Sequence, residues 1–117
     1  MKLDGFYKGT VGNNKSSWLG KTFFASKETG INNFKESGKI ITKYPFKTYL
    51  EKDLLKLDYG SAENPWWVRR IVDELKEITP TKFEGIMKIR IIFGILLPIG
   101  RFKLEKSSIE NILKDSL

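Results

Sequence analysis

Residues 39–59 read KIITKYPFKTYLEKDLLKLDY. Apolar and polar side chains mostly alternate along residues 39–51, and this period of two predicts a β-strand. A turn at 51–53 precedes a second alternating run at 55–59, so the chain is expected to return as the second strand of a β-hairpin. Pro45 cannot donate a hydrogen bond to a neighbouring strand, which places it at a sheet edge or a bulge.

Further alternating segments lie on both sides of this hairpin. Residues 4–11, 83–91 and 101–105 are predicted strands, and residues 18–24 are predicted as a strand or a short turn of helix. Residues 26–38 are rich in Gly, Asn and Ser, so we expect mainly loop there. Five or more strands with internal glycines predict a mainly β protein, an antiparallel β-barrel that leaves no exposed strand edge.

One or two short helices are expected beside the sheet. Asn64-Pro65 is a helix-start signal, and the apolar spacing that follows fits a helix to about residue 78. A strand from Val72 is the alternative, because the segment is only half apolar. A capping-box pattern that begins at Ser107 predicts a short final helix.

The composition restricts the chemistry. The chain has 117 residues, so we expect one barrel domain over 1–117. It has no Cys and no His, which excludes disulfides, thiolate nucleophiles, imidazole catalysis, and zinc or haem held by these residues. No catalytic residue, metal site or cofactor is predicted. The first residues carry no export signal, so a cytoplasmic location is expected.

Four short motifs resemble those of small lipocalin-like, calycin-type barrels from bacteria. They are Gly5-Phe6-Tyr7-Lys8-Gly9, Ser17-Trp18-Leu19-Gly20-Lys21-Thr22-Phe23, Asp73-Glu74-Leu75 with Phe83-Glu84-Gly85-Ile86, and Arg101-Phe102-Lys103-Leu104-Glu105-Lys106. The resemblance implies a strand over 72–79 with a helix restricted to 64–70, which we favour over a helix to residue 78. It also implies a cavity for a small apolar or amphipathic ligand. The haem-binding relatives use an axial His, which this chain lacks.

Arg69 and Arg70 follow Trp66-Trp67 and form the first candidate site. A guanidinium binds a carboxylate in two-pronged fashion, and an indole offers a stacking plane, so one arginine is expected to hold an acidic ligand head. Its loss would then weaken binding about 10- to 150-fold. In the alternative reading Trp67 closes one end of the barrel and both arginines pair with carboxylates: Asp58, Asp73 or Glu74.

Asp73 and Glu74 point to opposite faces of a strand, so one of them is expected inside the barrel. A buried carboxylate would suit acid–base chemistry, although an ion pair with Arg70 or Arg90 is the structural alternative. Tyr44, Tyr59 and Asn32 are expected to line a cavity or, for the tyrosines, to be core. The predicted ligand-binding set is Tyr44, Tyr59, Trp67, Arg69, Arg70 and Asp73.

The apolar segment Ile95–Ile99 is unusual for a connection. It is expected to touch a membrane, mediate self-association or cap the barrel. The net charge of +7, with Lys43, Lys47 and Tyr49 on one strand, suggests a nucleic-acid interface, but we expect weak, salt-sensitive affinity.

The favoured function is therefore a binding protein for a small hydrophobic or amphipathic ligand, with an acidic head if the arginine hypothesis holds. An enzyme that uses an interior carboxylate or Tyr on an apolar substrate is the alternative, and a basic nucleic-acid-binding module is the third candidate. The predicted core comprises Tyr44, Phe46, Leu55, Leu57, Met87, Ile89, Phe102 and Leu104.

Overall fold

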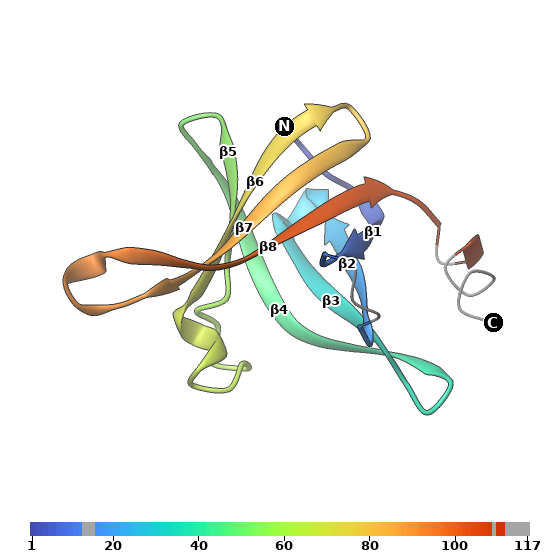
Figure 1. The fold of residues 1–117 in the computed structure, drawn as a ribbon, viewed down its shortest axis with the longest axis horizontal. Helices are drawn as coiled ribbons and strands as arrows, with labels where there is room; N and C mark the ends of the chain where they lie inside the picture. Colours follow the sequence, from blue (N-terminus) through green and yellow to red (C-terminus); the bar gives the residue numbers. More distant parts are fainter. Residues whose placement is uncertain (13–15, 109, 112–117) are drawn as a thin grey trace.

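The computed structural model describes residues 1–12, 16–108 and 110–111. Eight antiparallel strands follow one another around a closed barrel, and the last strand pairs with the first (Figure 1). This confirms the predicted mainly β fold and the antiparallel barrel. The strands are β1 Gly5–Thr10, β2 Trp18–Phe24, β3 Thr29–Glu36, β4 Lys39–Glu51, β5 Leu54–Asp58, β6 Ile71–Thr79, β7 Lys82–Arg90 and β8 Leu96–Lys106.

Three short 3-10 turns interrupt the strands: η1 Ala25–Lys27, η2 Val68–Arg70 and η3 Ile92–Gly94. Strand β6 begins directly after η2, which confirms the strand alternative for 72–79. Asn64 does not cap a helix as predicted, because its side chain is buried and donates to two backbone carbonyls, those of Pro45 and Tyr59. Most of the final helix predicted from Ser107 falls outside the described residues.

Strand β3 corrects the prediction of a loop over 26–38. Its polar residues are satisfied inside the barrel wall rather than by water: the Asn33 amide, for example, donates to Thr22 Oγ1 at 2.9 Å. Gly30 has no side chain, and the Phe46 ring occupies the space where a Cβ would stand. These long-range contacts outweigh the local turn preference of Gly and Asn.

Strand β4 bends at a bulge. Between the pairs Gly30↔Phe46 and Asn32↔Lys43, β4 contains one more residue than β3. Pro45 lies in this bulge, as predicted, and needs no donor there. Tyr44 beside it has a φ of 61°, a left-handed conformation that turns its ring toward the barrel opening.

The core fills one part of the barrel and leaves the other part open. Leu57 and Leu75 are completely buried, and aromatic rings pack edge to face around them, including Tyr7, Phe23 and Phe46. The predicted core residues Phe46, Leu55, Leu57, Phe102 and Leu104 are buried. Tyr44, Met87 and Ile89 are partly exposed instead, because Tyr44 and Met87 border a cavity and Ile89 lies near the end of β7.

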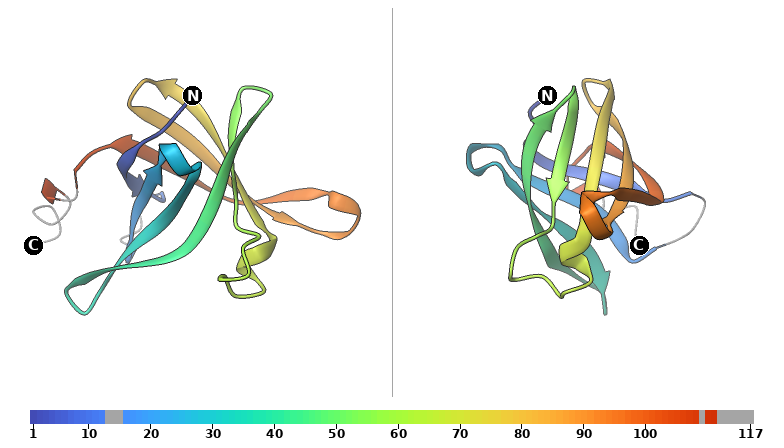
Figure 2. Two further views of the ribbon diagram at one scale, coloured as in Figure 1. Left: turned by 180° about the vertical axis from the view of Figure 1, so that it is seen from behind. Right: turned by 90° about the vertical axis from the view of Figure 1, so that its left-hand side faces the viewer.

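The up-and-down order of the strands places alternate connections at the same end of the barrel. The β1–β2, β3–β4, β5–β6 and β7–β8 connections lie at one end, hereafter the open end, and the other connections lie at the opposite end. At the open end the β7–β8 hairpin projects far beyond the barrel (Figures 1 and 2). Ile95–Ile99, predicted as a loop, lies in this hairpin, mostly within β8. Among the described residues no helix is long and apolar enough to cross a bilayer.

Candidate functional site: a cavity at the open end of the barrel

A cavity of about 390 Å³ lies at the open end of the barrel, lined mainly by strand residues and by the β5–β6 connection. Its volume falls in the range of small-molecule sites and equals roughly 13 waters at their share of the liquid. Most of its wall is apolar or aromatic, whereas its floor is polar. The lining residues are Val11, Trp18, Lys21, Asn32, Phe34, Tyr44, Tyr59, Trp67, Val68, Ile71, Asp73, Met87, Ile99, Gly100, Arg101 and Phe102.

Trp18 reaches the cavity because β2 is irregular at its start. The pairing with β3 shifts between Trp18 and Gly20, and Gly20 has a φ of 139°, which side chains other than hydrogen rarely allow. The indole covers Gly9 of β1 and meets the Phe102 ring edge to face, with centroids 5.6 Å apart. Two glycines therefore make room for a tryptophan wall.

The connection between β5 and β6 forms another wall. The buried Asn64 amide donates to the carbonyls of Pro45 and Tyr59 at 2.8 and 2.9 Å, which ties this connection to β4 and β5. Trp67 then lies against the Tyr44 ring at the cavity rim, with 5.9 Å between centroids. The aromatic rim is thus built from two segments that one asparagine holds together.

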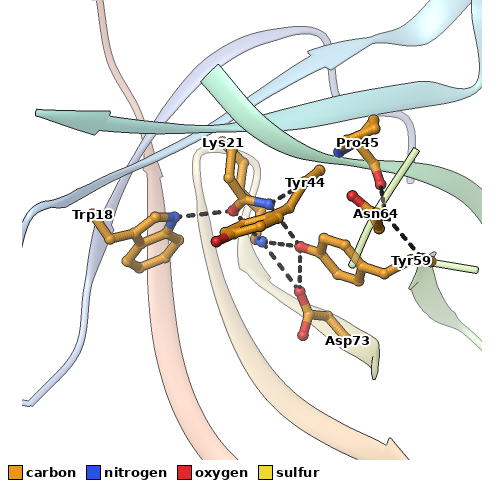
Figure 3. A network of polar contacts seen from close by, with 8 residues as sticks. Trp18, Lys21, Tyr44, Pro45, Tyr59, Asn64 and Asp73 are labelled. Carbon is orange, nitrogen blue, oxygen red and sulfur yellow. Dashed lines mark hydrogen bonds and ion pairs between the residues drawn. The ribbon is translucent and has the colours of Figure 1, made fainter. Parts of the chain in front are cut away.

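The floor is an ion pair formed across the barrel. Lys21 comes from β2 and Asp73 from β6, and closure of the barrel brings these strands opposite each other. Lys21 Nζ lies 3.1 Å from Asp73 Oδ2, and both residues are 3% exposed or less (Figure 3). The Tyr59 hydroxyl donates to the same carboxylate oxygen at 2.9 Å and accepts from Lys21 at 2.5 Å.

Asn32 joins this pair to the aromatic wall. Its side-chain oxygen accepts from Lys21 Nζ at 2.8 Å and from Trp18 Nε1 at 3.0 Å. Its amide nitrogen donates to the Tyr59 hydroxyl at 3.0 Å and to the Tyr44 carbonyl at 3.1 Å. A connected buried network of this kind fixes each side chain in one orientation.

Burial governs the protonation of the floor. It lowers the pKa of the Lys21 ammonium, while the charge of Asp73 and the hydrogen bond to it act in the opposite direction. Four aromatic rings also stand 5.2–5.5 Å from Lys21 Nζ and favour its charged form. Burial raises the pKa of Tyr59 well above its ordinary value, and Asp73 adds to this shift, so the phenol stays protonated.

One oxygen of the floor has no hydrogen-bond partner within the described protein. Oδ2 of Asp73 binds both Lys21 and Tyr59, but Oδ1 is buried without a donor. Figure 3 shows this oxygen turned away from both partners. A buried carboxylate oxygen left without a donor is costly.

The structure brings together four of the six predicted ligand-binding residues. Tyr44, Tyr59, Trp67 and Asp73 border the cavity, as does Asn32. Asp73 is also the interior carboxylate that the strand alternation predicts. Whether these residues bind a ligand stays a prediction.

Arg69 and Arg70 do not border the cavity. Arg69 donates to the carbonyls of Asn64 and Ala62, and Arg70 donates to the carbonyl of Arg90. The ion pairs of these carboxylates differ from those predicted for the arginines: Asp73 pairs with Lys21, Glu74 with Lys56 and Lys88, and Asp58 with Arg90. Burial acts to raise the pKa of Glu74, but hydrogen bonds to its two lysines outweigh it, so the pKa is lowered.

Alanine variants separate the two roles of these arginines. The ligand role predicts that Arg69→Ala or Arg70→Ala weakens binding of a medium-chain fatty acid about 10- to 150-fold. Because Arg69 holds two carbonyls of the β5–β6 connection, we expect Arg69→Ala to melt earlier with fatty-acid affinity unchanged. Thermal melts and titrations on both variants check this. A large loss of affinity with an unchanged melting temperature would restore the ligand role.

Three cavity residues are missing from the predicted ligand-binding set: Trp18 and Lys21, which appear only in a family-like motif, and Met87, which was predicted as core. A signal for Lys21 exists, because it stands two positions before Phe23 in a strand and so shares its inward face. Regular alternation would place Trp18 on the face opposite to Lys21 and Phe23. Its ring still reaches the cavity, because the register of β2 shifts between Trp18 and Gly20. Met87 lies at the expected inward position but was expected to be fully buried.

A larger hollow of about 760 Å³ lies outside the barrel along β6, β7 and β8. Its wall mixes polar and apolar residues, and the carboxylate of Glu74 is already neutralised there by Lys56 and Lys88. The cavity at the open end is the better candidate because it is apolar and contains a polar atom without a partner. Within residues 1–12, 16–108 and 110–111, no three carboxylates gather to hold a metal ion.

No family model, no curated protein and no solved structure matches this chain. The barrel is compatible with the lipocalin-like fold that the short motifs imply.

Proposed function

We propose that this protein is a lipocalin-like binding protein that holds one small amphipathic molecule in the open end of its barrel. The apolar body of the ligand would lie among Trp18, Phe34, Tyr44 and Met87. Its polar end would meet the floor formed by Lys21 and Asp73. The observation that carries the proposal is an apolar cavity of about 390 Å³ whose buried floor contains an unpartnered carboxylate oxygen.

The same oxygen defines the polar end of the ligand. Oδ2 of Asp73 already has two donors, whereas Oδ1 has none. A hydroxyl, amide N–H or ammonium group of the ligand would donate a hydrogen bond to Oδ1, whereas a ligand carboxylate would be repelled by the Asp73 carboxylate. We therefore propose a ligand with a hydrogen-bond donor, such as a medium-chain alcohol, in place of the acidic head that the arginine pair suggests.

Native mass spectrometry of the protein purified from cells tests the proposal. We expect a mass increment for one small molecule that disappears after the protein is denatured. An environment-sensitive apolar dye should then bind the stripped protein at one site and be displaced by medium-chain alcohols. Protein that carries no increment and binds neither dye nor alcohols would overturn the proposal.

An enzyme is the second candidate, and the desolvated Asp73 favours it. A carboxylate oxygen with no donor, in an apolar site, is placed to accept a proton from a bound substrate. The two functions differ in what happens to the bound compound. A binding protein returns the extracted compound unchanged after prolonged incubation, whereas an enzyme returns a product of different mass, retention time or isotope content in deuterated water.

A further inference from the structure

The β7–β8 hairpin carries an apolar surface that the barrel does not use. Its outer part, residues 91–99, is hereafter the apolar arm. Phe93 at the tip is 93% exposed and Ile92 is 70% exposed. Ile95, Leu97 and Ile99 are each about half-exposed. Ile95 and Leu97 are two positions apart and share one face, and Ile99 follows at a bulge of β8 beside the cavity, so the three form an apolar stripe along the arm. Exposed apolar surface of this extent marks an interaction site.

Cations surround the root of the apolar arm. Residues 85–104 contain four Lys or Arg and no acidic residue. Lys88 and Arg90 lie at the end of β7, and Arg70 reaches the same place by donating to the Arg90 carbonyl at 3.0 Å. Arg101 stands on β8 where the arm meets the cavity. Glu74 pairs with Lys88, and Asp58 pairs with Arg90. The net charge at the root of the arm is still positive, because Arg70 and Arg101 add to it.

We propose that the apolar arm inserts into the interface of an anionic lipid bilayer. Apolar side chains beyond a ring of Lys and Arg match the hydrocarbon boundary and the negative headgroups of such a surface. Trp66 belongs to the β5–β6 connection at the same end of the barrel and is 72% exposed, as expected for an interfacial aromatic anchor. This proposal is independent of the proposed ligand, because it rests on the outside of the barrel.

A second copy of the chain is the competing occupant, and the charges disfavour it. Two arms packed side by side would bring their cationic roots together, whereas anionic lipids neutralise them. Pro98 also lacks the N–H group with which this part of β8 would extend a sheet to a partner.

Docking through the arm would place the cavity beside the membrane. Ile99 belongs to the apolar stripe and also lines the cavity, so the stripe runs from the tip to the cavity mouth. An apolar molecule that leaves the bilayer along this stripe would cross little water before it reaches the site.

Co-sedimentation with vesicles tests the arm. The full chain is mixed with phosphatidylcholine vesicles, with and without a minority of phosphatidylglycerol. We expect the wild type to sediment with the anionic vesicles and to be released by high salt. The double variant Ile92→Ser, Phe93→Ser should partition at least about tenfold less, because two fully apolar side chains are lost.

Leu50→Ser is the matched control, since Leu50 is 57% exposed at the opposite end of the barrel. It should bind vesicles like the wild type, and all three proteins should melt alike. Wild-type protein that stays in the supernatant with anionic vesicles would overturn the proposal. So would a double variant that sediments as well as the wild type. Lipid-free wild type that is a dimer by sedimentation velocity, with the double variant monomeric, would assign the arm to a second copy instead.

Discussion

Replacing Asp73 with Ala is expected to lower the free energy of unfolding by about 3–5 kcal/mol. The change removes the counter-charge of Lys21, whose almost completely buried amino group then lies beside Asn32, Tyr59 and aromatic rings without a carboxylate. A buried charge without its partner is among the most costly defects in a protein interior. Urea unfolding of the wild type and the variant measures the difference.

The double variant Lys21→Met, Asp73→Leu is the control for this prediction. It removes both charges and fills their volume with apolar groups. Its free energy of unfolding should therefore be higher than that of the wild type or lower by less than about 1 kcal/mol. Recovery of stability in the double variant would show that the pair is not needed for folding. A loss below about 1 kcal/mol for Asp73→Ala alone would contradict the buried pair.

Truncating a buried side chain in the core of the barrel is the second change that we expect to lower the free energy of unfolding strongly. Leu57→Ala and Phe102→Ala should each cost about 2–5 kcal/mol, because each leaves a cavity between strands that cannot close it. Leu57 is completely buried, and the Phe102 ring lies between the open face of Gly85 and the edge of Trp18.

Ile78→Ala is the matched control for these truncations. Ile78 is 49% exposed near the end of β6, so its truncation should change stability by less than about 0.5 kcal/mol. Urea or thermal unfolding compares the three variants. A loss below about 0.5 kcal/mol at both Leu57 and Phe102 would contradict their inward placement.

The alternating strands could be predicted from the sequence because their signal is local. In the hairpin of residues 39–58, one face is repeatedly apolar, and the turn residues 52 and 53 both take a positive φ. Pro45 could be assigned to a bulge because its missing N–H restricts it wherever it stands. Such features need no knowledge of distant contacts.

Strand β3 could not be predicted in this way. Its Gly30, Asn32 and Asn33 have local preferences for turns, and they are strand residues here because of distant partners. Gly30 accommodates the Phe46 ring. Asn32 bonds to four residues: Trp18 and Lys21 of β2, Tyr44 of β4, and Tyr59 directly after β5. Tertiary contacts decide such segments.

Only part of the site could be predicted, because local alternation identifies inward-facing residues but not their partners on distant strands. Tyr44, Tyr59 and Asp73 could be chosen as polar residues on inward faces. The partner of Asp73 could not, because Lys21 is 52 positions away in the chain and meets it only when β2 closes opposite β6. Arg69 and Arg70 attract attention as a charged pair beside two indoles, yet their groups are directed to backbone carbonyls.

The most direct test of the proposed function compares two ligands of matched shape. Isothermal titration is carried out with 1-decanol, which has a hydroxyl donor, and with decyl methyl ether, which has none. Wild-type protein should bind the alcohol at one site and the ether at least about tenfold more weakly, because the ether leaves Oδ1 of Asp73 without a donor. The double variant Lys21→Met, Asp73→Leu should bind both alike. Equal affinity of the wild type for the two compounds, or no saturable binding of either, would contradict the account.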